Sequence, residues 1–185
     1  MIRSAVIALL LAGPVVAQTA VEPQVPEGYP PVMGEVTATV GGRDVVWQTY
    51  DFSVGAFDAS AWVNDLDDQI TLRIMAYPEG QPDKMEDRLL IEVVFPLFPS
   101  PGSTPKSVLV EVLGVKDSDG RKLTSGTSPV VFTLDEFSRN SYAYGRTKGS
   151  FEATICLKRT ATAKLSKKCQ PIKGRFDTEI QFDNM

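Results

Sequence analysis

Apolar and polar residues alternate along most of the chain after Met33, and a two-residue period is typical of half-buried β-strands. Val36, Ala38 and Val40 form the first such pattern, and Gly41-Gly42 follows them as a turn. Similar strand patterns cover residues 45–52, 70–77, 89–95, 108–115 and 130–134. Asp119-Gly120 adds a strong hairpin-turn signal. The chain therefore reads as a series of short strands joined by turns.

One segment is compatible with a short helix. Between Ala56 and Asp68, Trp62 and Leu66 lie four residues apart, and Asp58 is a suitable N-cap. Elsewhere helical periodicity is almost absent, and the strands are regularly spaced. This pattern predicts an all-β fold, namely an antiparallel β-sandwich of the jelly-roll or immunoglobulin-like kind with at most one short helix.

Two short segments near the C-terminus repeat one pattern. Residues 149–155 and 174–180 both read Gly-x-Phe-acidic-small-x-Ile. We expect two neighbouring antiparallel strands whose apolar positions share one face. The residues expected to face the core are Phe151, Ala153, Ile155, Phe176, Thr178, Ile180 and Phe182. Those expected to face water are Glu152, Thr154, Asp177 and Glu179.

The N-terminal region predicts export. Arg3 precedes an apolar run from Ala5 to Ala12, and the small or modest residues that a signal peptidase recognises lie at Val15 and Ala17. Residues 1–17 therefore resemble a signal peptide that is cleaved after Ala17. Residues 18–32 are rich in proline and predict an extended arm. We expect residues 33–185 to form a single domain.

The same region bears on the final location of the protein. Pro14 stands where a lipoprotein signal would need cysteine, so we expect no lipid anchor. No later apolar run approaches the roughly 18 residues of a membrane span. These features predict a protein that is periplasmic or secreted.

The chain has two cysteines, Cys156 and Cys169, and no histidine. In an oxidising compartment two cysteines most often pair, although free thiols and a redox couple are alternatives. A redox couple usually has two intervening residues, whereas twelve separate these cysteines. We therefore expect a structural disulfide. Cys156 shares its strand parity with Glu152 and Thr154, which predicts a position on the solvent side.

Positive charge concentrates around the expected disulfide. Between Arg146 and Arg175 there are nine basic residues and one acid, although the whole chain carries a net charge of −4. One interpretation is a contact surface for an anionic partner, either an envelope component or an acidic protein. The other is a solvated hairpin tip, because charge runs commonly have no further role. The candidate binding residues are Lys158, Arg159, Lys164, Lys167, Lys168 and Lys173.

Other chemistry has weaker support. The absence of histidine excludes Ser-His-Asp and Cys-His catalysis and the usual zinc sites. Ser103 and Lys106 match a Ser-x-x-Lys pattern, but they lie in a Pro/Gly-rich loop. The acidic segments 64–68 and 117–120 leave calcium binding open, although the second segment lacks the downstream glutamate of an EF-hand. We assign no catalytic residue, metal or cofactor, and we expect no nucleic-acid partner because the basic loop contains no aromatic residue.

Two functional hypotheses follow. The first is a non-enzymatic binding or structural protein of the cell envelope that uses the basic loop, residues 157–168. The alternative is a carbohydrate-binding or carbohydrate-acting module that uses carboxylates and aromatic residues, although large aromatics more often fill a core. Its candidate aromatics are Trp47, Tyr50, Trp62, Tyr77, Tyr142 and Tyr144, and the last two share a parity.

Overall fold

The computed structural model describes residues 27–53, 59–66, 69–115, 121–159 and 163–183. Within these ranges every regular element is a strand, which confirms the all-β prediction. The strands are β1 (Val32–Val40), β2 (Arg43–Tyr50), β3 (Ala61–Leu66), β4 (Gln69–Pro78), β5 (Arg88–Phe95), β6 (Ser107–Leu113), β7 (Lys122–Thr124), β8 (Val131–Arg139), β9 (Tyr144–Lys158) and β10 (Cys169–Asp183). The described residues contain no helix of the length and apolarity that a membrane crossing requires.

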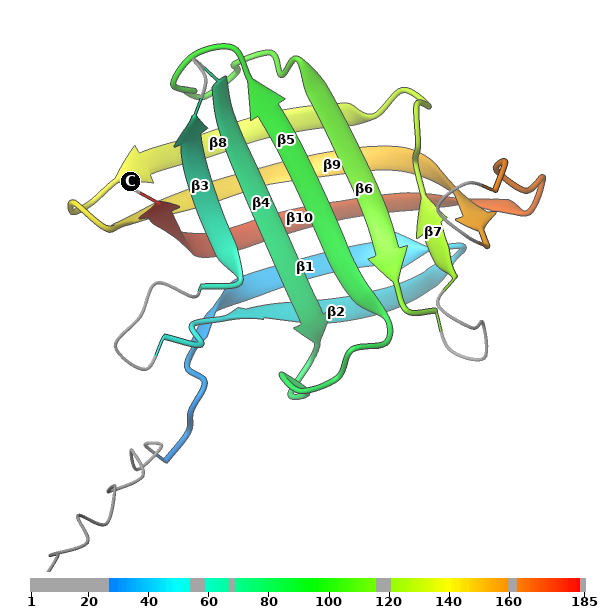
Figure 1. Cartoon of the computed structure of the whole chain (residues 1–185), viewed down its shortest axis with the longest axis horizontal. Coiled ribbons are helices and arrows are strands. Elements are labelled where there is room, and N and C mark those ends of the chain that lie inside the picture. The colour runs from blue at the N-terminus through cyan, green and yellow to red at the C-terminus, as the bar shows by residue number, and fades with distance from the viewer. Residues whose placement is uncertain (1–26, 54–58, 67–68, 116–120, 160–162, 184–185) are drawn as a thin grey trace, which may run out of the picture.

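The strands form two layers that cross at a steep angle (Figure 1). The front layer in Figure 1 contains β3, β4, β5 and β6, and the rear layer contains β2, β1, β10, β9 and β8. Pairings β10–β3, β2–β4 and β7–β9 connect the layers, so all ten strands belong to one sheet folded over itself. The narrower sandwich assignment stays a prediction.

The helix expected between Ala56 and Asp68 is wrong over the part that the structure describes. Residues 61–66 form β3, which pairs antiparallel with β4 and parallel with the end of β10. Ala61 and Val63 are buried, whereas Trp62 and Asn64 are part-exposed, and this is the period of a strand. Pairing with two neighbouring strands supplies the backbone hydrogen bonds that decide the conformation. Residues 56–58 and 67–68 lie outside the described residues.

The core lies between the two layers and consists of the alternate residues that the sequence pattern indicated. In β4, Ile70, Leu72, Ile74 and Ala76 are all at most 5% exposed. The predicted inward positions of β10, from Phe176 to Phe182, are all at most 4% exposed. Each layer thus buries one face of its strands against the other, as packed sheets do.

The repeated Gly-x-Phe pattern has a packing cause. β9 and β10 pair antiparallel in a register that places Gly149 opposite Phe176 and Gly174 opposite Phe151. A Cβ atom on Gly149 would lie 2.5 Å from the Phe176 ring, and one on Gly174 would lie 2.7 Å from the Phe151 ring. Each phenylalanine therefore occupies the space above the glycine across the strand pair, so the two segments need the same pattern.

Candidate anion-binding surface

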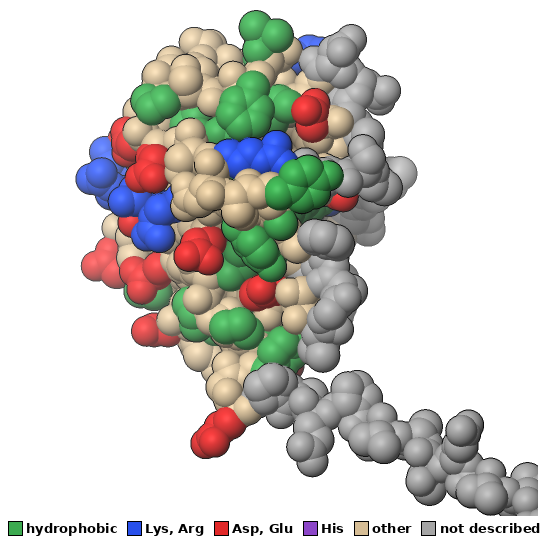
Figure 2. Space-filling view, turned by 90° about the vertical axis from the view of Figure 1, so that its left-hand side faces the viewer, with side chains coloured by type: hydrophobic (Ala, Val, Ile, Leu, Met, Phe, Trp, Pro, Cys, Tyr) green, Lys and Arg blue, Asp and Glu red, His purple; other side chains and the backbone are tan. Residues whose placement is uncertain are grey.

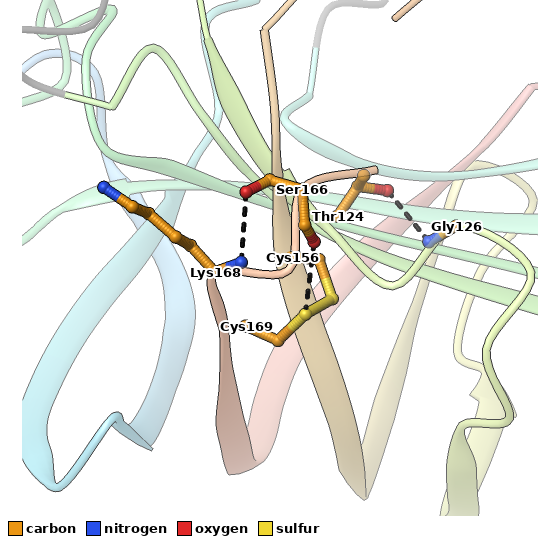
Figure 3. Close-up of a disulfide and its surroundings, with 6 residues drawn as sticks. All are labelled: Thr124, Gly126, Cys156, Ser166, Lys168 and Cys169. Atoms are coloured by element: carbon orange, nitrogen blue, oxygen red, sulfur yellow. Dashed lines mark hydrogen bonds between the residues drawn. A yellow bond between two sulfur atoms is a disulfide. The ribbon is translucent and has the colours of Figure 1, made fainter. Parts of the chain in front are cut away.

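A disulfide joins the end of β9 to the start of β10 and closes the basic loop, as the sequence predicted. Cys156 and Cys169 are directly opposite each other in the strand register, with an S–S distance of 2.04 Å. Cys156 lies on the outer side of β9 by parity, but it is only 8% exposed, whereas Cys169 is exposed. Figure 3 shows residues of the returning loop beside the bridge. The sequence therefore predicted correctly that Cys156 lies on the outer face of β9, but its side chain is buried rather than exposed to solvent.

Backbone hydrogen bonds hold both ends of the basic loop. Leu157 donates its N–H to the Lys168 carbonyl at 3.0 Å, and Ser166 donates to the Leu157 carbonyl at 2.9 Å. The Ser166 hydroxyl accepts a hydrogen bond from the Lys168 N–H at 3.0 Å (Figure 3). These contacts extend the β9–β10 ladder past the disulfide. Residues 160–162 of the loop lie outside the described part of the chain.

Five of the six candidate cations lie on the basic loop, namely Lys158, Arg159, Lys164, Lys167 and Lys168. Lys158 is part-exposed and the other four are exposed. No ion pair joins any of these five side chains to a carboxylate within the described ranges. Their positive charges therefore face solvent without a compensating partner among the described residues.

The sixth candidate, Lys173, has a different environment. It lies on the outer side of β10, directly opposite Glu152 of β9, and its Nζ forms an ion pair with that carboxylate. Three further basic residues that the sequence had grouped with the loop are also on strands and also paired. Arg146 pairs with Asp177, Lys148 pairs with both Glu136 and Asp177, and Arg175 pairs with Asp135. The structure thus separates Lys173 from the loop cations.

Two basic residues that sequence reasoning missed lie near the loop because of long-range pairing. Lys122 of β7 is directly opposite Lys158, but its Nζ lies 2.7 Å from the Glu111 carboxylate, which is 4% exposed. Gly41 donates its N–H to the Pro171 carbonyl at 2.9 Å and so places the β1–β2 turn, with exposed Arg43, beside the start of β10. No local sequence signal connects either residue to the loop.

The remaining sequence candidates do not form a second site among the described residues. The Ser103 hydroxyl accepts a hydrogen bond from the Ser100 N–H, whereas Lys106 Nζ contacts the Gln69 side chain at 3.3 Å. Asn64 and Asp65 are successive residues of β3 and point to opposite faces. No group of three histidine, cysteine or carboxylate side chains in the described ranges is placed to hold a metal ion. Residues 67–68 and 117–120 lie outside those ranges.

The candidate sugar-binding aromatics are dispersed. Trp47 and Tyr50 are buried at 2% and 3% exposure, and Trp62 is on the outer side of the front layer. Tyr142 lies in the β8–β9 turn and Tyr144 begins β9, at the end opposite the basic loop (Figure 1). The fifteen residues of β9 span roughly 46 Å. The tyrosines and the basic loop therefore do not line a common surface.

The β8–β9 turn instead belongs to an aromatic end of the molecule. The Arg139 guanidinium lies 4.6 Å from the Phe182 ring and 5.5 Å from the Tyr142 ring. Phe98 stacks on Phe182, and the neighbouring Leu97 is 78% exposed. Figure 2 looks onto this end and shows hydrophobic side chains on both sides of an extended basic one. Two of these residues, Arg139 and Tyr142, are of types that are enriched in binding hot spots.

No protein-family model matches the chain, and neither a curated protein nor a solved structure does.

Proposed function

We propose that the protein is an exported, non-enzymatic binding protein of the cell envelope that contacts an anionic partner through the basic loop. The observation that carries the proposal is the group of five cations without carboxylate partners among the described residues, on a loop closed by the Cys156–Cys169 disulfide. A closed loop loses less conformational freedom on binding than an open one, so more of the electrostatic attraction appears as affinity. Anionic lipid headgroups fit this surface because the charges lie at one end of an elongated pair of strands.

The proposed location rests on two features. The first seventeen residues have the composition of a signal peptide, and the disulfide suits an oxidising compartment such as the periplasm or the exterior. A binding role is also consistent with a chain that has no histidine and in which Ser103 and Lys106 contact different partners.

Vesicle binding tests the proposal. At low salt the purified protein should sediment with vesicles that contain phosphatidylglycerol and not with neutral vesicles, and added salt should release it. Lys167→Glu with Lys168→Glu should abolish sedimentation. The control is Lys84→Glu with Lys106→Glu, which makes the same charge change on the two loops that flank β5 and should leave binding largely intact. Equal losses in both variants, or no binding by the wild type, would refute the proposal.

A second candidate function, carbohydrate binding, is favoured by Tyr142, which is 75% exposed at the aromatic end. Aromatic faces offer flat apolar surface with a polar edge, which suits sugar rings. A glycan array probed with and without calcium would test it, and Tyr142→Ala should remove any binding observed. No glycan bound under either condition would eliminate this candidate.

A further inference from the structure

The two layers present outer faces of opposite character. On the rear layer most outward side chains are charged or polar, although Val46 and Val131 also point outward, and the exposed ones include Thr37, Thr39, Glu152, Thr154, Lys173 and Arg175. Figure 2 shows charged side chains along its left-hand edge, where this face lies. Such a polar face is what water contact requires of an antiparallel sheet. We call it the polar face.

The outer face of the front layer carries a group of apolar side chains among polar and charged ones such as Thr71, Arg88 and Glu111. Its outward positions include Trp62, Met75, Leu90, Val94, Leu109 and Leu113. All six are part-exposed, and none of them is packed against the core between the layers. We call this surface the apolar face. These six side chains are the apolar area of the front layer that a partner would bury.

An ion pair lies at the centre of the apolar face. Arg73 and Glu92 are directly opposite each other on β4 and β5, and their side chains are paired although 40% and 27% exposed. The strand register continues this row to Trp62 on one side and Leu109 on the other. The Arg73 guanidinium also lies 5.1 Å from the Trp62 ring. The row across β3 to β6 therefore consists of an aromatic residue, a cation, an anion and an aliphatic residue, in that order.

We propose that a second copy of this chain covers the apolar face in a two-fold symmetric dimer. The row is self-complementary about an axis that runs along the strands between β4 and β5. Rotation about this axis places Trp62 against Leu109 of the second copy and Arg73 against Glu92 of the second copy. At the next outward position along the strands, Met75 meets Leu90 in the same way, because these two residues are also directly opposite in the register.

Charge balance favours a second copy over a charged partner. The central row carries one cation and one anion, Lys122 and Glu111 form a second neutral pair, and Arg88 adds one positive charge, so the face is close to neutral. Two copies of a chain with net charge −4 can approach through a neutral face with the least repulsion. Four strands at usual spacings give a footprint of about 500 Å² on each copy, which is below the roughly 800 Å² per partner of a standard interface and fits a weak one. The dimer should therefore dissociate on dilution.

Sedimentation velocity over a concentration series tests the dimer. The wild type should shift from the monomer mass towards twice that mass as concentration rises. Leu109→Ser should raise the dissociation constant roughly tenfold or more, because it removes apolar contact at both ends of the row. Lys173→Glu, which breaks an ion pair on the polar face, is the matched control and should leave the dissociation constant unchanged. A wild type that stays monomeric at its highest soluble concentration would overturn the proposal.

A charge-exchange experiment tests the geometry separately from stability. Arg73→Glu alone opposes two carboxylates across the axis, and Glu92→Arg alone opposes two guanidinium groups, so each variant should be monomeric. An equimolar mixture should form heterodimers, because the carboxylates at positions 73 and 92 of one chain then meet the guanidinium groups at positions 92 and 73 of the other. Circular dichroism checks that both variants fold, and the double exchange in one chain should restore the homodimer. Monomers in the mixture, when the wild type dimerises, would refute this arrangement.

Discussion

At the scale of single residues, the glycines of the repeated pattern are determined by the aromatic rings across the strand pair. Gly149 and Gly174 lie on the inward side of their strands, and side chains on the facing strands occupy the space that a Cβ atom would need. The Thr133 carbonyl lies only 2.3 Å from the Cβ position of Gly149. Even one methyl group therefore requires the sheet or the ring to move.

We predict that Gly149→Ala and Gly174→Ala each destabilise the protein by about 1–3 kcal/mol, because overpacking displaces neighbouring groups. Urea unfolding followed by circular dichroism measures the change. Ser150→Ala, at the outward position beside Gly149, is the control and should change stability by at most about 0.5 kcal/mol. The combination of Gly149→Ala with Phe176→Leu should cost less than the sum of the two single changes. Strict additivity would show that the ring and the glycine do not share this space.

Tyr50 provides a second prediction, on pH. Burial raises the pKa of the Tyr50 phenol above its ordinary value, and Glu79 and Asp83 act in the same direction. A raised pKa means that the folded state favours the protonated phenol. Its contribution to stability is therefore complete below about pH 10 and is lost as the pH rises through the folded-state pKa.

The Tyr50 phenol also donates a hydrogen bond to Gln48 Oε1 at 2.8 Å. Tyr50→Phe should cost about 0.5–1.5 kcal/mol at neutral pH and should lose less stability than the wild type above about pH 10. Urea unfolding at a series of alkaline pH values measures both effects. The prediction fails if the wild type and Tyr50→Phe lose stability in parallel over that range.

At the scale of the elements, the disulfide and the β9–β10 ladder act together. The bridge closes a loop of twelve intervening residues at the point where the two longest strands begin to separate. Replacing both cysteines with alanine should lower stability by about 3 kcal/mol, since the unfolded chain regains the freedom that the closed loop removes. A thiol reductant should destabilise the wild type by a similar amount and leave the double variant unchanged. Two alkylatable thiols in unreduced exported protein would contradict the pairing.

The strands show what sequence patterns can and cannot predict. Alternation located β1, β4 and β10 and their inward residues, because the inward face of each packs on the core. It failed at β3, a six-residue segment in which Trp62 and Leu66 also fit a helix. Pairing of β3 with β4 and β10 decides that conformation, and the residues of β3 alone do not predict which strands it pairs with. The group of apolar side chains on the outer face of the front layer was missed for the same reason, since it appears only when four strands lie side by side.

The candidate site was also predicted only in part from the sequence. The disulfide was predicted because the chain has two cysteines and a predicted export signal, and cysteines in an oxidising compartment commonly pair. A count of charges along the chain placed Lys173 with the loop cations, although Glu152 across the ladder neutralises it. Sequence proximity therefore overestimated the basic surface by including charges that cross-strand carboxylates balance.

At the scale of the whole molecule, the crossing of the two layers determines where the basic loops would lie in the proposed dimer. The strands of the rear layer run at a steep angle to β4 and β5, and the basic loop lies at one end of them (Figure 1). A two-fold axis along β4 and β5 turns the rear layer of the second copy end for end. The two basic loops would then point away from each other, so each could contact a different anionic surface.

This geometry predicts that the wild type clusters vesicles that contain phosphatidylglycerol, because one dimer bridges two of them. Dynamic light scattering should show particle size rising with protein concentration at low salt. Leu109→Ser should bind the vesicles in sedimentation without clustering them, whereas Lys167→Glu with Lys168→Glu should do neither. The two variants therefore separate a failure of the dimer from a failure of the basic loop. Clustering by Leu109→Ser equal to that of the wild type would show that bridging does not depend on the apolar face.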